Sequence, residues 1–118
     1  MKAVIYHNAA CSKCRATLEI LNKNNIETEI VNYLDNPPEK NELEVILKKL
    51  GKKPEEVIRF GETVAKEQGL SVSDNRNASE WLDIMIANPI LIERPIVVIG
   101  DKAVLGRPPE NVNKLLEG

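Results

Sequence analysis

The chain has 118 residues, with 16 Lys and Arg against 18 Asp and Glu, and its net charge of −2 excludes the basic excess that direct nucleic-acid binding needs. Its composition, 42% hydrophobic and 29% charged, is typical of a globular protein, and we expect a single domain over residues 1–118 that is a monomer. Because aromatic residues make up only 3%, we expect a core of Leu, Ile and Val. No apolar run approaches the roughly 18 residues of a membrane-spanning helix, so we expect no membrane and a cytoplasmic protein.

The first third of the chain predicts a strand, a helix and a second strand. Residues 3–7 are a β-branched and aromatic run typical of a strand, and apolar residues at helical spacing follow over 11–24. Residues 27–32 predict the next strand. A helix that connects neighbouring strands almost always makes a right-handed crossover between parallel strands, so we expect these two strands to be parallel.

The middle of the chain, about residues 41–90, predicts a helical region inserted between the strands. Apolar residues recur at helical spacing over 42–50, and Pro54 can open a further short helix that runs through Arg59. A capping pattern at Asn77 begins the last helix of this region, which a proline must end.

The last part of the chain predicts two strands and a helix. Residues 96–99 are a β-branched run, and residues 102–105 can return antiparallel beside it because Gly100-Asp101 is a hairpin dipeptide. Pro109 fits the first turn of a terminal helix whose apolar stripe packs on the sheet. The order is therefore βαβ, a helical region and ββα, which predicts an α/β fold.

Two cysteines, Cys11 and Cys14, stand at the start of the first predicted helix. Unpaired backbone N–H groups and the helix dipole favour an anion there, so the pKa of the Cys11 thiol should fall below the free value of about 8.5. A basic neighbour, which Lys13, Arg15 or His7 can supply, would lower that pKa further. Cys14 lies one helical turn on and can reach Cys11 to form a disulfide, so both are candidate redox residues.

Each of these residues also has a structural interpretation. Cys14 lies on the apolar stripe of its helix and can be a small core residue. A structural zinc site has four ligands, whereas two cysteines with His7 supply three, so we expect no metal. His7, the only histidine, either tunes the Cys11 thiolate or ends its strand.

Five motifs occur along the chain in an order that resembles one known family. They are YHNAAC at 6–11, YL with NPP at 33–38, NPILI at 88–92, ERPIVV at 93–98 and GRP at 106–108. Together they resemble the glutaredoxin-linked arsenate reductase family of thioredoxin-like proteins. The resemblance implies a thioredoxin-like fold with a mixed four-stranded sheet and helices.

The resemblance also implies a function in arsenic detoxification, the reduction of arsenate to arsenite with Cys11 as the nucleophile. It implies glutathione as co-substrate, glutaredoxin as partner and no tightly bound cofactor. Guanidinium groups bind tetrahedral oxyanions through paired hydrogen bonds, so arginines suit the substrate pocket. Pro95 resembles the cis-proline that thioredoxin-like proteins place beside the active cysteine. The pocket residues that the resemblance implies are Asn8, Arg59, Arg94 and Arg107.

The second cysteine leaves other functions open. Cys14 could form an intramolecular disulfide with Cys11 and so replace the glutathione step, or the pair could serve a plain thiol–disulfide oxidoreductase. Spx-type transcription regulators share the fold, use a C-x-x-C pair as a redox switch and bind RNA polymerase. A regulator has no need of a pocket arginine such as Arg107, which favours the reductase.

Overall fold

The computed structural model describes residues 2–8 and 10–116. The chain forms two compact units, one of residues 1–36 with 94–118, here called the sheet unit, and one of residues 37–93, here called the helical unit. The helical unit is thus one continuous segment between the two halves of the sheet unit. Whether the chain is a single domain remains a prediction.

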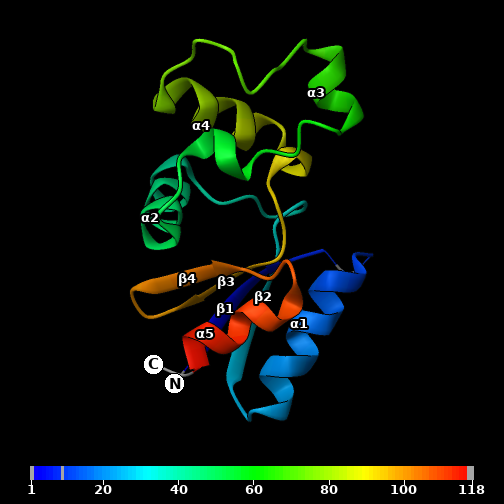
Figure 1. Cartoon of the computed structure of the whole chain (residues 1–118), viewed down its shortest axis with the longest axis vertical. Coiled ribbons are helices and arrows are strands. Elements are labelled where there is room, and N and C mark those ends of the chain that lie inside the picture. Colours follow the sequence, from blue (N-terminus) through cyan, green and yellow to red (C-terminus); the bar gives the residue numbers. More distant parts are fainter. Residues whose placement is uncertain (1, 9, 117–118) are drawn as a thin grey trace. The chain divides into compact units, whose positions relative to one another are not determined.

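The sheet unit contains one sheet of four strands (Figure 1). Its strands follow the order β2-β1-β3-β4, with β1 parallel to β2 and β3 antiparallel to both β1 and β4. The sheet is therefore mixed, and the predicted βαβ and ββα halves of an α/β fold are confirmed. The strands are β1 (Lys2–His7), β2 (Glu27–Asn32), β3 (Ile96–Ile99) and β4 (Lys102–Leu105).

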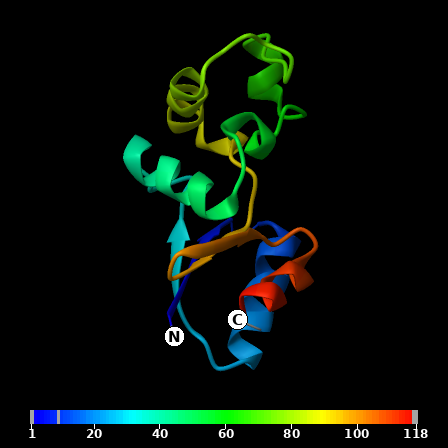
Figure 2. The same ribbon diagram turned by 60° about the vertical axis from the view of Figure 1, so that its left-hand side comes forward.

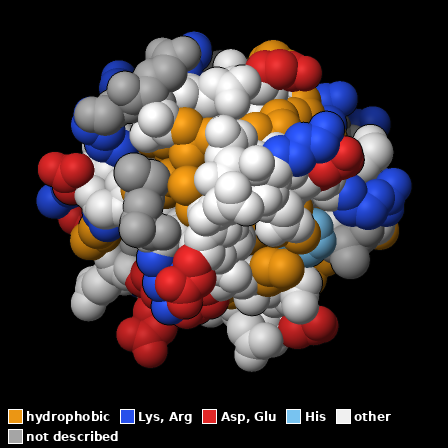
Figure 3. Space-filling view, turned by 90° about the horizontal axis from the view of Figure 1, so that it is seen from below, with side chains coloured by type: hydrophobic (Ala, Val, Ile, Leu, Met, Phe, Trp, Pro, Cys, Tyr) orange, Lys and Arg blue, Asp and Glu red, His pale blue; other side chains and the backbone are white. Residues whose placement is uncertain are grey.

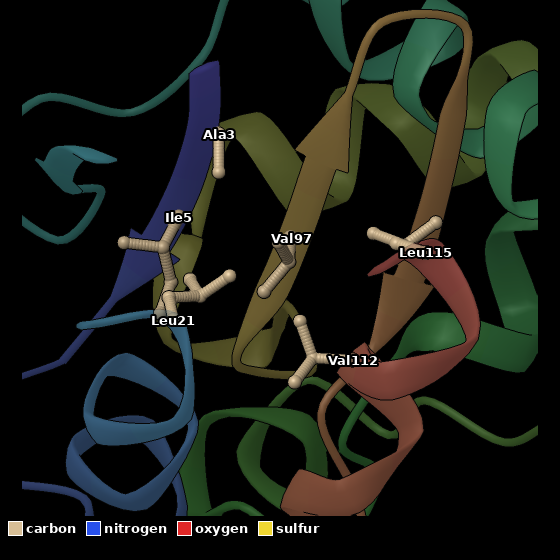
Figure 4. Close-up of a cluster of buried hydrophobic side chains, with 6 residues drawn as sticks. All are labelled: Ala3, Ile5, Leu21, Val97, Val112 and Leu115. Carbon is tan, nitrogen blue, oxygen red and sulfur yellow. The ribbon is translucent and has the colours of Figure 1, made fainter. Parts of the chain in front are cut away.

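Two helices, α1 (Ser12–Lys23) and α5 (Asn113–Leu116), lie side by side on one face of this sheet (Figures 1 and 2). The predicted terminal helix begins as a 3₁₀ turn over Pro109–Val112 and becomes α-helical only for its last four described residues. Side chains from the sheet and both helices form the core between them (Figure 4). These core residues are Ala3, Ile5, Leu21, Val97, Val112 and Leu115.

The helical unit contains α2 (Lys40–Leu50), α3 (Thr63–Glu67) and α4 (Ala78–Ala87), with 3₁₀ turns over Pro54–Val57 and Pro89–Leu91. The cap predicted for α4 is confirmed. Asn77 Oδ1 accepts a hydrogen bond from the Glu80 N–H at 2.8 Å, and Glu80 Oε1 accepts one from the Asn77 N–H at 3.2 Å. These bonds satisfy two of the N–H groups that a helix start leaves unpaired.

The short helix predicted to run through Arg59 is wrong at its end, because the 3₁₀ turn stops at Val57. Ile58 instead forms an antiparallel bridge with Ile92, and the Arg59 N–H donates to the Leu91 carbonyl at 2.7 Å. The backbone there is bonded to a segment distant in sequence, so it cannot continue the local i to i+3 bonds of a 3₁₀ helix.

Most of the buried hydrophobic residues are Leu, Ile and Val, as expected, but the low aromatic content did not predict the buried tryptophan. Trp81 of α4 is fully buried, and its ring meets Phe60 edge to face with centroids 5.8 Å apart. Aromatic rings bury large areas and favour such edge-to-face pairs, so this pair adds to a core of the helical unit that is otherwise mainly aliphatic.

Acidic and basic side chains are interspersed over the face displayed in Figure 3, in keeping with the net charge of −2. Hydrophobic side chains form small separate patches on that face (Figure 3). Among the described residues, no helix is both long enough and apolar enough to cross a membrane.

Candidate active site

Cys11 is the N-cap residue of α1, at the end of the loop that follows β1. Its backbone N–H donates to the Asn8 carbonyl at 2.9 Å, and Asn8 Oδ1 accepts from the Ala10 N–H at 3.0 Å. The loop is thus closed on Asn8, a common use of Asn in turns. It leaves the partly exposed Cys11 sulfur at the positive end of the helix.

The surroundings of Cys11 favour its thiolate. Burial raises the pKa of the Cys11 thiol, but the backbone N–H and the thiol of Cys14 act in the opposite direction. The backbone N–H of Lys13 and the charge of Arg107 add to this effect and bring the pKa to about 7. The contacts between the sulfur and these N–H groups fall short of a standard N-cap hydrogen bond. A large fraction of Cys11 is therefore ionised near neutral pH, as a nucleophilic thiol requires.

Arg107 holds a guanidinium group against the Cys11 sulfur. Its Nη2 donates a hydrogen bond to Cys11 Sγ at 3.7 Å, and its Nε donates to the backbone carbonyl of Arg94 at 2.6 Å. The first contact stabilises negative charge on the sulfur, while the second fixes the direction of the guanidinium plane. Arg107 follows Gly106 directly after β4, so the end of a strand positions it.

Arg94 lies just before β3, and its side chain hydrogen-bonds to both Cys11 and Tyr33. Burial lowers the pKa of the Arg94 guanidinium, but the Tyr33 oxygen and the Cys11 sulfur outweigh that effect and raise it. Arg94 is therefore fully charged beside the sulfur, where an oxyanion substrate would carry negative charge.

Tyr33 is a site residue to which no role was predicted from the sequence. It follows the last residue of β2, the residue is 1% exposed, and its hydroxyl hydrogen-bonds to the Arg94 side chain. Tyr33 and Arg94 are far apart in the sequence, and no spacing rule connects them. The only signal was the YL motif at 33–34, which carried no assigned chemistry.

Cys14 is fully buried in the first turn of α1 and hydrogen-bonds to Cys11. Burial raises its pKa, and the negative charge of Cys11 adds to this, so that the pKa is about 11 despite the backbone N–H of Asn8 and the charge of Arg94. The two cysteines are both free thiols. Cys11 is partly exposed and its surroundings favour the thiolate, whereas Cys14 is covered and its surroundings favour the protonated thiol, which is the usual asymmetry of a redox pair.

Gly106 allows the arginine-bearing loop to approach α1 and Pro95. Its N–H donates to the Pro95 carbonyl at 2.9 Å, and a Cβ placed on it would lie 2.6 Å from Thr17 Oγ1 and 2.7 Å from Pro95 Cγ. No side chain fits in that space.

The Arg94–Pro95 and Arg107–Pro108 peptide bonds are both cis.

His7 ends β1 and its side chain is buried. Burial lowers the pKa of the His7 imidazole, and the positive charge of Arg15 lowers it further, so both favour the neutral form. Within the described residues its Nδ1 makes no hydrogen bond. The predicted influence of His7 on the Cys11 thiolate remains a prediction.

Arg59 belongs to the helical unit, where its guanidinium lies between two carboxylates. Its Nε is 3.2 Å from Glu62 and its Nη1 is 4.0 Å from Glu93. These ion pairs give Arg59 partners within its own unit, and its place in an oxyanion pocket remains a prediction.

The structure thus brings several of the predicted residues around one sulfur and adds Tyr33. Those that contact Cys11 directly are Asn8, Lys13 through its backbone N–H, Cys14, Arg94 and Arg107. Among residues 2–8 and 10–116, no cluster of three His, Cys, Asp or Glu side chains could hold a metal ion. A partly exposed thiolate beside two guanidinium groups is suited to attack on an anionic, electrophilic substrate.

Comparison with known proteins places this arrangement in context. The model of the ArsC family matches residues 6–115. The uncharacterized protein YfgD of Escherichia coli strain K12 is 44% identical over 95% of this chain and 94% of its own, and an arsenate reductase of Haemophilus influenzae is 41% identical over 98% and 100%. The solved structure of an arsenate reductase from Vibrio cholerae, 37% identical, superposes with a TM-score of 0.90 over 97% of each chain. This agreement confirms the predicted thioredoxin-like fold.

Proposed function

The chain belongs to the ArsC family, and from this membership together with its site we propose that it is an arsenate reductase whose nucleophile is the Cys11 thiolate. One observation carries the proposal: the Arg107 Nη2 lies 3.7 Å from Cys11 Sγ, so a nucleophilic sulfur and an oxyanion-binding group share one site. Relatives and a solved structure that are named arsenate reductases support the choice of arsenate as the oxyanion.

The first step is attack of the Cys11 thiolate on arsenic. A bond forms between Sγ and arsenic, an As–O bond breaks, and hydroxide leaves with its electron pair. Arg94 and Arg107 bind the arsenate oxygens and reduce the repulsion between an anionic nucleophile and an anionic substrate. On the basis of the family resemblance, we also include Asn8 and Arg59 in the proposed oxyanion pocket. On the same basis we include His7 among the proposed catalytic residues.

Thiols supply the two electrons that convert arsenic(V) to arsenic(III). We propose glutathione as co-substrate and glutaredoxin as the protein partner, with no tightly bound cofactor or metal. The partly exposed Cys11 sulfur supports this because an external thiol must reach it or a disulfide that contains it.

The experiment that tests this function is arsenate-dependent oxidation of NADPH, coupled through glutathione reductase, glutathione and glutaredoxin, with arsenite measured directly. We expect turnover by the natural protein and none above blank by Cys11→Ser. A Cys11→Ser protein that is as active as the natural one, or a folded and reduced natural protein without arsenite formation, would contradict the proposal.

The contact between Cys11 and Cys14 favours a second candidate function, a thiol–disulfide pair used for exchange or as a switch. Such a protein would be an oxidoreductase acting on other thiols or an Spx-type regulator that binds RNA polymerase. Such a protein would need the two sulfurs but not Arg107. Thiol–disulfide exchange or polymerase binding that is lost in both Cys11→Ser and Cys14→Ser, but is unchanged in Arg107→Gln, would favour this second function.

A further inference from the structure

The buried thiol of Cys14 has no task in the attack step, yet it is the sulfur placed next to the nucleophile. It is fully covered and hydrogen-bonds to Cys11. An external thiol cannot reach Cys14, and Cys14 has no sulfur partner other than Cys11 among the described residues. Within the described part of the chain, the Cys14 thiol can therefore react with one sulfur, that of Cys11, to which the substrate would be bonded.

We propose that Cys14 resolves the Cys11–arsenate adduct, so that arsenite leaves as a Cys11–Cys14 disulfide forms. External reductant then acts on that disulfide. This inference rests on the proposed function. It changes the point at which glutathione enters, because a dithiol protein such as glutaredoxin or a thioredoxin reduces the internal disulfide after arsenite has gone, and glutathione only regenerates it.

The step balances in atoms and electrons. The Cys14 sulfur attacks Cys11 Sγ, the S–S bond forms, and the S–As bond breaks with its electron pair moving to arsenic. Arsenic(V) becomes arsenic(III), two thiols become one disulfide, and the Cys14 proton passes to an oxygen of the departing arsenite. A sulfur in contact with the adduct has a far higher effective concentration than dissolved glutathione.

The charges around Cys14 favour attack by Cys11 first and by Cys14 second. While Cys11 is a thiolate, its negative charge and the hydrogen bond it accepts keep the Cys14 proton in place. Once Cys11 is bonded to arsenic, both effects end, and burial alone then opposes the charge of Arg94 and the backbone N–H of Asn8, which lower the pKa of Cys14. The Cys14 thiol is thus easier to ionise in the adduct than in the free enzyme.

The test is a single turnover without any external thiol. The full chain is reduced, freed of reductant and mixed with excess arsenate, and arsenite, free thiols and intact mass are measured. We expect about one arsenite per chain, loss of both thiols and a mass consistent with an internal disulfide. Cys14→Ser should release no arsenite until glutathione and glutaredoxin are added. Cys14→Ala, which buries no hydroxyl, is the second variant, and thermal unfolding checks that both fold.

The outcomes separate the two proposals. If the natural protein forms arsenite only after glutathione is added, and at the same rate as Cys14→Ser, this inference is overturned while the arsenate reductase function stands. If no thiol, glutathione–glutaredoxin or thioredoxin system yields arsenite, the proposed function fails and takes this inference with it. Arsenite and a disulfide without added thiol would support both.

Discussion

Arg107 donates a hydrogen bond from Nε to the backbone carbonyl of Arg94 at 2.6 Å, so the backbone that carries one guanidinium group beside Cys11 holds the other. Arg94 precedes β3 and Arg107 follows β4. The hairpin formed by these strands therefore determines the spacing of both charges, and a displacement of either arginine affects the other. Replacing the Arg107 side chain should therefore remove one positive charge and also shift the backbone at Arg94.

The first prediction concerns the shape of the Arg107 side chain. Arg107→Lys keeps a positive charge but cannot bind an oxyanion with two parallel N–H groups, nor retain the Nε bond to Arg94. We expect kcat/KM for arsenate to fall about 100-fold. Arg76→Lys is the matched control, because Arg76 lies over the Trp81 ring in the helical unit and should leave kcat/KM near the natural value. Equal effects of the two substitutions would remove Arg107 from the pocket.

The second prediction concerns the pH dependence of Cys11. Because its pKa is lowered to about 7, alkylation by iodoacetamide should be slow below pH 7, half-maximal near pH 7 and constant above about pH 8. The charge of Arg107 contributes to that lowering, so Arg107→Gln should move the midpoint to higher pH. Stopped-flow alkylation of the protein with Cys14 in place reports on Cys11, because Cys14 is fully buried and its pKa is raised to about 11. A midpoint at the ordinary thiol value in both proteins would contradict the described environment.

The third prediction tests Tyr33 as a positioning residue for Arg94. Tyr33→Phe keeps the buried ring and removes the hydroxyl that bonds the guanidinium. A hydrogen bond to a charged group contributes about 1.5–3 kcal/mol, and we expect a rise of about tenfold in KM for arsenate with a smaller change in kcat.

A double-mutant cycle distinguishes positioning from a general effect on the fold. In the Arg94→Lys background, Tyr33→Phe should have little further effect on kcat/KM, because the partner it orients is gone. Additive losses in the double variant would show that Tyr33 acts elsewhere.

The fourth prediction concerns the close approach at Gly106. Gly106→Ala introduces a methyl group within 3 Å of Thr17 and Pro95, which overpacks the site and should cost about 1–3 kcal/mol in the free energy of unfolding. Arsenate reduction should also fall, because the loop that carries Arg107 must shift. Gly61→Ala, where no atom lies within 4 Å, is the control, and urea unfolding measures both. A Gly106→Ala protein as stable and active as the control would contradict this packing.

Local patterns predicted the secondary structure well where they were sufficient. The spans of β2, β3 and β4 agree with the predicted ranges, because β-branched runs and the Gly100-Asp101 turn specify them locally. The segment after Val57 was mispredicted because its backbone bonds to Leu91, a partner distant in sequence. Tertiary pairing of that kind leaves no periodicity in a single chain.

The candidate site divides in the same way. Position at a helix start indicated a reactive Cys11, and Cys14 followed from its spacing. Arg94 and Arg107 came from the family resemblance, since no pattern in the residues themselves relates them to the cysteines. Tyr33 required three-dimensional structure, because its contact with Arg94 joins the end of β2 to the start of β3.

The sheet unit takes its residues from two segments on either side of the helical unit in the sequence, and this arrangement determines when the surroundings of Cys11 are completed during translation. Cys11 leaves the ribosome early, but β3, the strand that pairs with β1, and Arg107 are synthesised only after the whole helical unit. A nascent chain that stops short of residue 107 carries Cys11 without the guanidinium that contacts its sulfur. The thiol thus gains its contact with Arg107 only after residues 12–106 have been synthesised, and until then the helix start alone favours its thiolate.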